Sequence, residues 1–272
     1  MFRGLAFPAR TRQYDEPGYP ASMTIALGLF TSEGIVIAAD SEVSQDLVRV
    51  SGFKVFGFSD SNGGSIVVTG AGDTHYLQSA ASTIGKIFID HPQDPLADLE
   101  PTICEFLIKF YDDHVLPFTS DPPDISLIIG ARRGGESRGW SSEHNLLKEW
   151  GVPYVAVGVG EIYARSILGT FTRACDFESA KIMAAYVVWL VKQRVAYCGK
   201  DTQIVCLGPQ GASGFTQQQI RALEVVFADV KYLESVLFAY VFGSKSAAAA
   251  RDVVYKFIED LKRECAAAVS PQ

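Results

Sequence analysis

The order of strand-like and helix-like segments is the feature of this 272-residue chain that most limits its fold. Two groups of short apolar runs, rich in β-branched residues, are each followed by a pair of long helical segments. This order satisfies the layer rule if two stacked sheets are covered by helices on their outer faces, because each sheet then buries both of its faces. The order therefore predicts an α+β fold, a four-layer αββα sandwich with two stacked sheets inside and helices outside.

The expected elements lie between clusters of turn residues. The expected strands are 24–30, 34–40, 54–58, 65–69, 124–131, 138–142, 152–157 and 202–207. The expected helices are 73–89, 96–115, 161–171, 178–197, 217–242 with a break, and 246–267. Asp73 is the expected N-cap of the first helix. The segment 178–197 is apolar on nearly every face, as is typical of a helix held between two layers.

Charge and composition exclude several classes of partner. The net charge of −7 argues against nucleic acid, because affinity for phosphates needs clustered Lys and Arg. The five cysteines lack the close pairs of a zinc site or a disulfide framework. No apolar run is long enough to cross a bilayer. We therefore expect a cytoplasmic protein with reduced thiols, no metal, no nucleic-acid partner and no membrane partner.

The N-terminal segment differs from the rest of the chain. Residues 1–23 contain three prolines and several arginines without a sustained period, which predicts an N-terminal extension or propeptide. The even spread of apolar segments after this point predicts one domain over 24–272. That domain ends in an extra C-terminal helix beyond Ser246, whose role the sequence does not assign.

Two neighbouring segments carry a family resemblance. Residues 24–28 (Thr-Ile-Ala-Leu-Gly) and 34–41 (Gly-Ile-Val-Ile-Ala-Ala-Asp-Ser) resemble the start of mature proteasome β subunits and their bacterial proteasome-type peptidase relatives. These proteins are N-terminal-nucleophile (Ntn) hydrolases. In that family the nucleophilic threonine precedes the acidic residue of the second strand by a fixed interval. Counting back from Asp40 by that interval gives Thr24.

The resemblance continues along most of residues 24–208. Lys54, before Val-Phe, looks like the family's catalytic lysine, although the loop between Asp40 and Lys54 is two residues short. Residues 70–73 (Gly-Ala-Gly-Asp) resemble the family's glycine turn into the first helix. Residues 154–160 (Tyr-Val-Ala-Val-Gly-Val-Gly) resemble the later strand and glycine turn that precede the third helix.

The resemblance implies a threonine-type peptidase or amidohydrolase. A free N-terminal Thr24 supplies both a nucleophilic hydroxyl and, in its own α-amine, the base that takes the proton. Lys54 would favour deprotonation of both groups through its charge, and Asp40 would hold Lys54 in place. Gly70 is the candidate oxyanion hole, because a backbone N–H there is not shielded by a side chain. No cofactor is implied.

The resemblance also implies partners. We expect the chain to assemble with copies of itself into a ring-like homo-oligomer that acts on a peptide or protein substrate. An ATP-dependent unfoldase is a further partner that the resemblance allows. Thr24 would be exposed either by translation from Met23 and removal of that methionine, or by autocatalytic removal of residues 1–23.

Three residues depart from the family pattern. Val159 occupies the place of a serine, and Val195 and Cys198 occupy the places of an aspartate and a serine. Two alternatives therefore stay open, namely a non-catalytic structural subunit and an Ntn amidase for small amides. A buried ion pair would explain Asp40 and Lys54 without catalysis, and close packing would explain Gly70. The four histidines are isolated and no Gly-x-Ser-x-Gly motif is present, which argues against a serine triad or a zinc hydrolase.

Overall fold

The computed structural model describes residues 24–45, 48–117, 125–171, 175–242, 254–260 and 262–263. Within these residues the chain forms a mixed α/β fold built on antiparallel sheets. The expected extension over 1–23 and most of the expected helix over 246–267 lie outside the described residues. The assignment of residues 24–272 to one domain stays a prediction.

The first sheet has the strand order β10-β1-β2-β11-β12. Its strands are β1 (Ala26–Phe30), β2 (Ile35–Asp40), β10 (Tyr154–Val157), β11 (Thr202–Gly208) and β12 (Gly211–Gly214). The predicted hairpin of β1 and β2 is confirmed, with Gly28 opposite Ile37. The strand β12 was not predicted, because its sequence, Gly-Ala-Ser-Gly, has no apolar pattern.

The second sheet has the strand order β5-β6-β7-β8-β9. Its strands are β5 (Phe56–Ser59), β6 (Ser65–Ala71), β7 (Ser126–Arg133), β8 (Glu136–Glu143) and β9 (Leu146–Glu149). A separate hairpin of β3 (Glu42–Gln45) and β4 (Val48–Ser51) follows β2. The sequence missed β3, β4 and β9, which are four-residue strands with polar faces.

The helices follow the predicted order. They are α1 (Thr74–Asp90), α2 (Leu96–Phe110), the π-helical turn Tyr111–Val115, α3 (Glu161–Phe171), α4 (Phe177–Arg194) and α5 (Gln217–Phe242). Asp73 caps α1 as predicted, since its side chain accepts hydrogen bonds from the N–H groups of His75 and Tyr76. The predicted break in the helix over 217–242 is wrong, because α5 is continuous.

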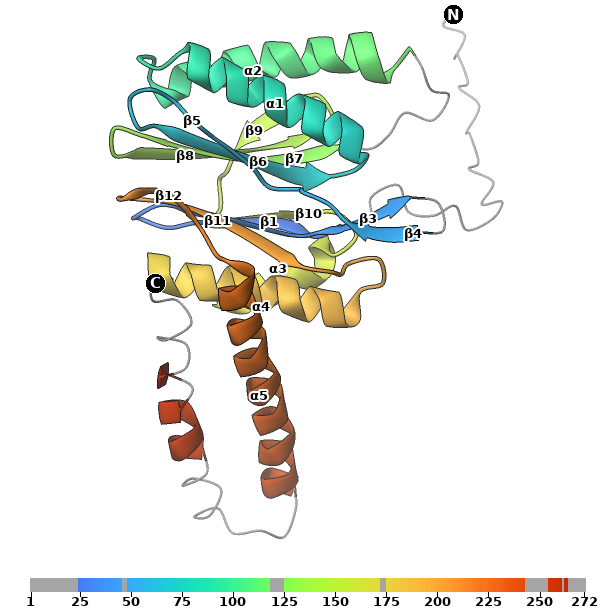
Figure 1. Cartoon of the computed structure of the whole chain (residues 1–272), viewed down its shortest axis with the longest axis vertical. Helices are drawn as coiled ribbons and strands as arrows, with labels where there is room; N and C mark the ends of the chain where they lie inside the picture. The colour runs from blue at the N-terminus through green and yellow to red at the C-terminus, as the bar shows by residue number, and fades with distance from the viewer. Residues whose placement is uncertain are drawn as a thin grey trace, which may run out of the picture.

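Apolar side chains pack on both faces of the first sheet. Val36 and Ala38 of β2 point to the face that α3 and α4 cover, whereas Ile35 and Ile37 point to the second sheet. Figure 1 shows α1 and α2 on the outer face of the second sheet and α4 against the outer face of the first. This two-sided burial explains why β2 reads as a continuous apolar run.

The helix α5 leaves the body of the protein. Its first turns pack against α4 through Ile220, Leu223 and Phe227, and Figure 1 shows the rest of the helix extending away from the sheets. Within the part of the chain that the structure describes, no helix combines the length and apolarity needed to cross a membrane. The expected cytoplasmic location stays a prediction.

Arg133, a largely buried residue at the end of β7, links the second sheet to α1, and we expect its removal to destabilise the fold. Arg133 donates from Nε to Asp60 Oδ2 at 2.9 Å and from its other nitrogens to the carbonyls of Phe88, His91 and Asp94. The Asp60 side chain is fully buried. Arg133→Ala leaves this carboxylate without its cation, so we expect the free energy of unfolding to fall by about 3 kcal/mol. Urea unfolding measures this loss. The control is Arg138→Ala, which breaks an exposed ion pair with Glu136 and should cost much less.

Candidate active site

Thr24 lies immediately before β1 and is held by a glycine turn. Its carbonyl oxygen accepts a hydrogen bond from Gly160 N at 3.3 Å. Gly158 adopts a φ of +96°, and a Cβ at this position would clash with the Thr24 carbonyl oxygen. The turn after β10 therefore requires a glycine for both its conformation and its close approach to Thr24. The Thr24 side chain itself is buried.

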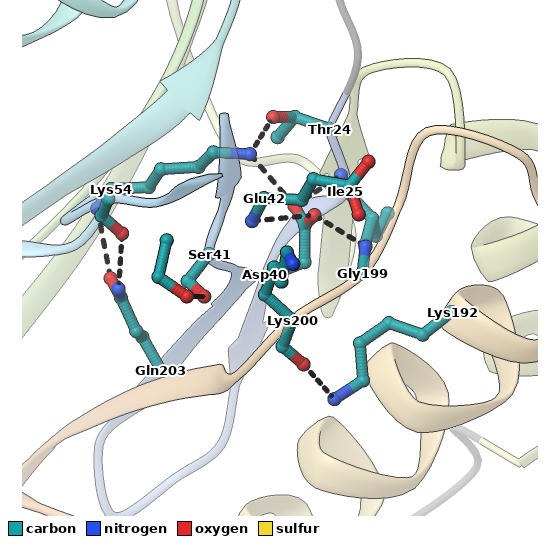
Figure 2. A network of polar contacts seen from close by, with 12 residues as sticks. Thr24, Ile25, Asp40, Ser41, Glu42, Lys54, Lys192, Gly199, Lys200 and Gln203 are labelled. Atoms are coloured by element: carbon teal, nitrogen blue, oxygen red, sulfur yellow. Dashed lines mark hydrogen bonds and ion pairs between the residues drawn. The ribbon is translucent and has the colours of Figure 1, made fainter. Parts of the chain in front are cut away.

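Asp40 is the last residue of β2 and is completely buried. Its Oδ1 accepts hydrogen bonds from Ile25 N and Lys54 Nζ, both at 3.1 Å. Its Oδ2 accepts from Gly199 N at 2.9 Å and from Glu42 N at 3.3 Å. Figure 2 shows these four donors converging on the carboxylate. All four neighbours are donors, so both carboxylate oxygens of Asp40 act as acceptors here.

Lys54 joins Asp40 to Thr24. Its Nζ donates to Asp40 Oδ1 and also to Thr24 Oγ1 (Figure 2). The Lys54 side chain is 4% exposed, so little water competes for these contacts. The structure thus brings together Thr24, Asp40 and Lys54, the three candidate site residues that are spread over 30 positions of the sequence. A cation beside a hydroxyl stabilises negative charge that develops on its oxygen.

Gly70 lies inside β6 and not in a turn. It pairs with Leu127, and a Cβ at Gly70 would clash with the Ser126 carbonyl oxygen of β7. The turn comes two residues later, at Gly72, which has a φ of +122°. Close packing therefore explains this glycine, and its role as an oxyanion donor stays a prediction.

The three residues that depart from the family pattern have different surroundings. Val195 is the C-cap of α4, and Val159 lines an open cleft of about 490 Å³. Burial raises the pKa of the Cys198 thiol to about 12, and the nearby charge of Asp40 contributes in the same direction. Cys198 is therefore a neutral thiol at physiological pH.

The cleft begins beside the turn that holds Thr24. It lies between the strands β8 and β9 on one side and β10 and α3 on the other, and Gly158 is part of its wall. Glu143 and Lys148 contribute charges of opposite sign to its lining. Its place next to Thr24 makes it a candidate path for a bound substrate.

A second polar network holds the loop between α4 and β11, which delivers Gly199 to Asp40. Lys192 of α4 donates to the carbonyl of Lys200 at 3.1 Å and to Thr202 Oγ1 and Glu224 Oε1, both at 2.7 Å. Lys200 has a φ of +60°, an uncommon conformation for a residue with a Cβ. Lys192 thus secures the loop at a strained position (Figure 2).

Sequence reasoning missed the residues that act through their main chain. The N–H groups of Gly199 and Glu42 bind Asp40, but a backbone contact of this kind leaves no mark in the residue type. Gln203 is a different case. It is the second residue of β11, and a long polar side chain near the start of a largely apolar strand was a usable signal. This side chain contacts the segment that carries Lys54.

The described residues contain no group of three or more His, Cys, Asp or Glu side chains that could hold a metal ion. What the arrangement offers instead is a hydroxyl, a buried cation and a buried carboxylate in series. Groups of this kind can activate a nucleophile without a metal.

Comparison with solved structures identifies the class of fold as proteasome-like. Anbu (ancestral beta-subunit) from Yersinia bercovieri is 16% identical, with a TM-score of 0.63 over 79% of this chain and 96% of that chain. Anbu from Hyphomicrobium sp. strain MC1 is 14% identical, with a TM-score of 0.63 over 78% of this chain and 97% of that chain. A Gly-1 mutant of the latter protein is 15% identical, with the same TM-score. No family model matches the sequence, and no curated protein matches it.

These comparisons correct the family that the sequence resemblance suggested. The resemblance pointed to proteasome β subunits and their bacterial proteasome-type peptidase relatives. That assignment is wrong, because the structural neighbours are Anbu proteins, which are proteasome-like but distinct. At 14–16% identity the match supports a proteasome-like Ntn fold at most.

Proposed function

We propose that this protein is an Ntn hydrolase of the αββα sandwich type that cleaves peptide or amide bonds with Thr24 as its nucleophile. The observation that carries the proposal is the contact of one buried Lys54 ammonium with both Thr24 Oγ1 and Asp40 Oδ1. The stacking of two helix-covered sheets and the likeness to Anbu folds support the sandwich type.

The mechanism requires that the bond between Met23 and Thr24 be cleaved. The α-amine of Thr24 then takes the proton of its own hydroxyl while Oγ1 attacks the substrate carbonyl. Lys54 stabilises the negative charge that develops on Oγ1, and Asp40 keeps Lys54 in position. In this proposal the Gly70 N–H stabilises the carbonyl oxygen of the tetrahedral intermediate.

Collapse of that intermediate breaks the carbon–nitrogen bond, and the departing amine receives the proton from the α-amine. The acyl group stays on Oγ1 as an ester. Water then attacks the ester, the α-amine takes the proton from the water, and Oγ1 regains a proton as the acid leaves. The steps call on Thr24, Lys54, Asp40, Gly70 and a water molecule, so the proposed mechanism uses no cofactor.

The experiment that tests the proposal is the intact mass and N-terminal residue of the purified native protein, measured beside hydrolysis of peptide and small-amide substrates. A chain that begins at Thr24 and hydrolyses either substrate supports it. A chain that retains residues 1–23 contradicts it, because the base of the mechanism is then tied up in a peptide bond. Preference for small amides over peptides would identify an amidase within the same mechanism.

The second candidate is a non-catalytic subunit. It is favoured by Val159, Val195 and Cys198, because none of these side chains carries the hydroxyl or carboxyl group of the family pattern at its position. Retention of residues 1–23 together with the absence of hydrolysis would favour this role. Both candidate functions are compatible with assembly of the protein into a homo-oligomer and with binding of an ATP-dependent unfoldase. Sedimentation of the native protein tests the assembly.

A further inference from the structure

We propose that Gln203 is a positioning residue that fixes the main chain of Lys54 and thereby holds its ammonium group against Thr24 and Asp40. The role in catalysis rests on the proposed function, whereas the fixing of the Lys54 main chain does not. Gln203 belongs to β11 and is distant from Lys54 in the sequence by 149 residues.

The Gln203 side chain makes three hydrogen bonds to one short segment. Its Oε1 accepts from Lys54 N at 2.9 Å and from Val55 N at 3.2 Å, and its Nε2 donates to the Gly52 carbonyl at 2.7 Å. Figure 2 shows the amide of Gln203 directly below the Lys54 main chain, on the side away from the ammonium group. Gln203 thus binds the main chain of this segment on one side, and Thr24 and Asp40 contact the ammonium group of its Lys54 side chain.

The segment needs such support because it has no regular structure of its own. Residues 52–55 lie between β4 and β5 and take part in no strand. Elsewhere in the sheet a neighbouring strand would satisfy these main-chain groups. Here a single side chain replaces that strand, and an amide is the group that both accepts from two N–H donors and donates to a carbonyl.

Gln203 also connects the main chain of Lys54 to the strand that pairs with the strand of Asp40. In the register of β11 and β2, Gln203 lies opposite Ala39 and its neighbour Thr202 lies opposite Asp40. One strand therefore sets the position of the Asp40 main chain and, through Gln203, of the Lys54 main chain. Loss of this link would leave the Lys54 ammonium group free to shift relative to Thr24 Oγ1.

Hydrogen exchange tests the positioning without any need for activity. In Gln203→Ala the amides of Lys54 and Val55 lose their acceptor, so we expect both to exchange about tenfold faster or more. The matched control is Gln217→Ala, which removes another side-chain amide that hydrogen-bonds β11. The Gln217 amide donates to the Thr202 carbonyl and not to residues 52–55. Unchanged exchange at Lys54 and Val55 in Gln203→Ala would overturn the proposal.

Kinetics test the role in catalysis. A displaced Lys54 affects the transition state more than substrate binding, so we expect Gln203→Ala to lower kcat about 10- to 100-fold with KM within about twofold. Gln203→Glu keeps the shape but not the donor to Gly52, and we expect it to rescue less than half of the lost kcat. A kcat equal to that of Gln217→Ala would overturn the catalytic part. Absence of hydrolysis in the unsubstituted protein would count against the proposed function itself, and the exchange result would still decide whether Gln203 fixes Lys54.

Discussion

Replacing Thr24 with alanine is expected to lower the hydrolysis rate by about 10³-fold or more, down to the background. The substitution removes Oγ1, the atom that forms the acyl ester, while leaving the α-amine and the Lys54–Asp40 ion pair in place. Initial rates of the processed protein on a peptide and on a small amide measure this effect. Supplying the variant from residue 24 onward avoids any dependence on self-cleavage.

Two further variants separate chemistry from folding. Thr24→Ser keeps a hydroxyl at the same position, so we expect it to retain measurable hydrolysis. Thr31→Ala removes another buried threonine hydroxyl, which binds Gly34 in the turn between β1 and β2 and contacts nothing at the site. It should lower stability slightly and leave kcat unchanged. Hydrolysis by Thr24→Ala at the unsubstituted rate would refute the assignment of the nucleophile.

The sequence predicted those structural features that depend on side-chain type and on short spacings. The two apolar runs around Thr31 give the hairpin of β1 and β2, and this hairpin alone brings Asp40 beside residue 25. The N-cap Asp73 was also readable, because an aspartate before a helical period has few other local uses. These features depend on short-range chemistry, which a single sequence records well.

The features that sequence reasoning missed depend on contacts between distant main-chain groups. The Gly199 N–H donates to Asp40 because Lys192 holds the loop after α4 in place through the Lys200 carbonyl. The residue types of this loop do not predict its conformation. The placement of Lys54 in a strand was wrong because its main chain is satisfied by Gln203, leaving β5 to begin at Phe56. A local pattern cannot tell a strand ladder from a side chain that replaces it.

The spacing of the site residues predicted their contacts correctly but predicted the wrong family. Thr24, Asp40 and Lys54 meet as expected, although the loop between the last two is short by two residues. The fold nevertheless matches Anbu structures with less than a fifth of residues identical. The same type of fold thus recurs at a low level of sequence identity.

Breaking the buried pair of Asp40 and Lys54 should remove a large part of the free energy of unfolding when only one partner is replaced. Asp40→Asn puts an amide donor among four donors and leaves the ammonium of Lys54 buried without its partner. Lys54→Met leaves the carboxylate buried without its cation. We expect each single variant to lose about 3–5 kcal/mol in the free energy of unfolding.

The double variant distinguishes a coupled pair from two independent residues. When Asp40→Asn and Lys54→Met are combined, neither charge is left alone, so the loss should be smaller than the sum of the single losses by about 1–3 kcal/mol. Urea unfolding of all four proteins measures this difference, and hydrolysis should be absent in all three variants. Strictly additive losses would mean that Asp40 does not hold Lys54, and the mechanism would then lose the group that orients its cation. Recovered stability without recovered activity is the result expected if the ion pair is retained for chemistry and not for folding.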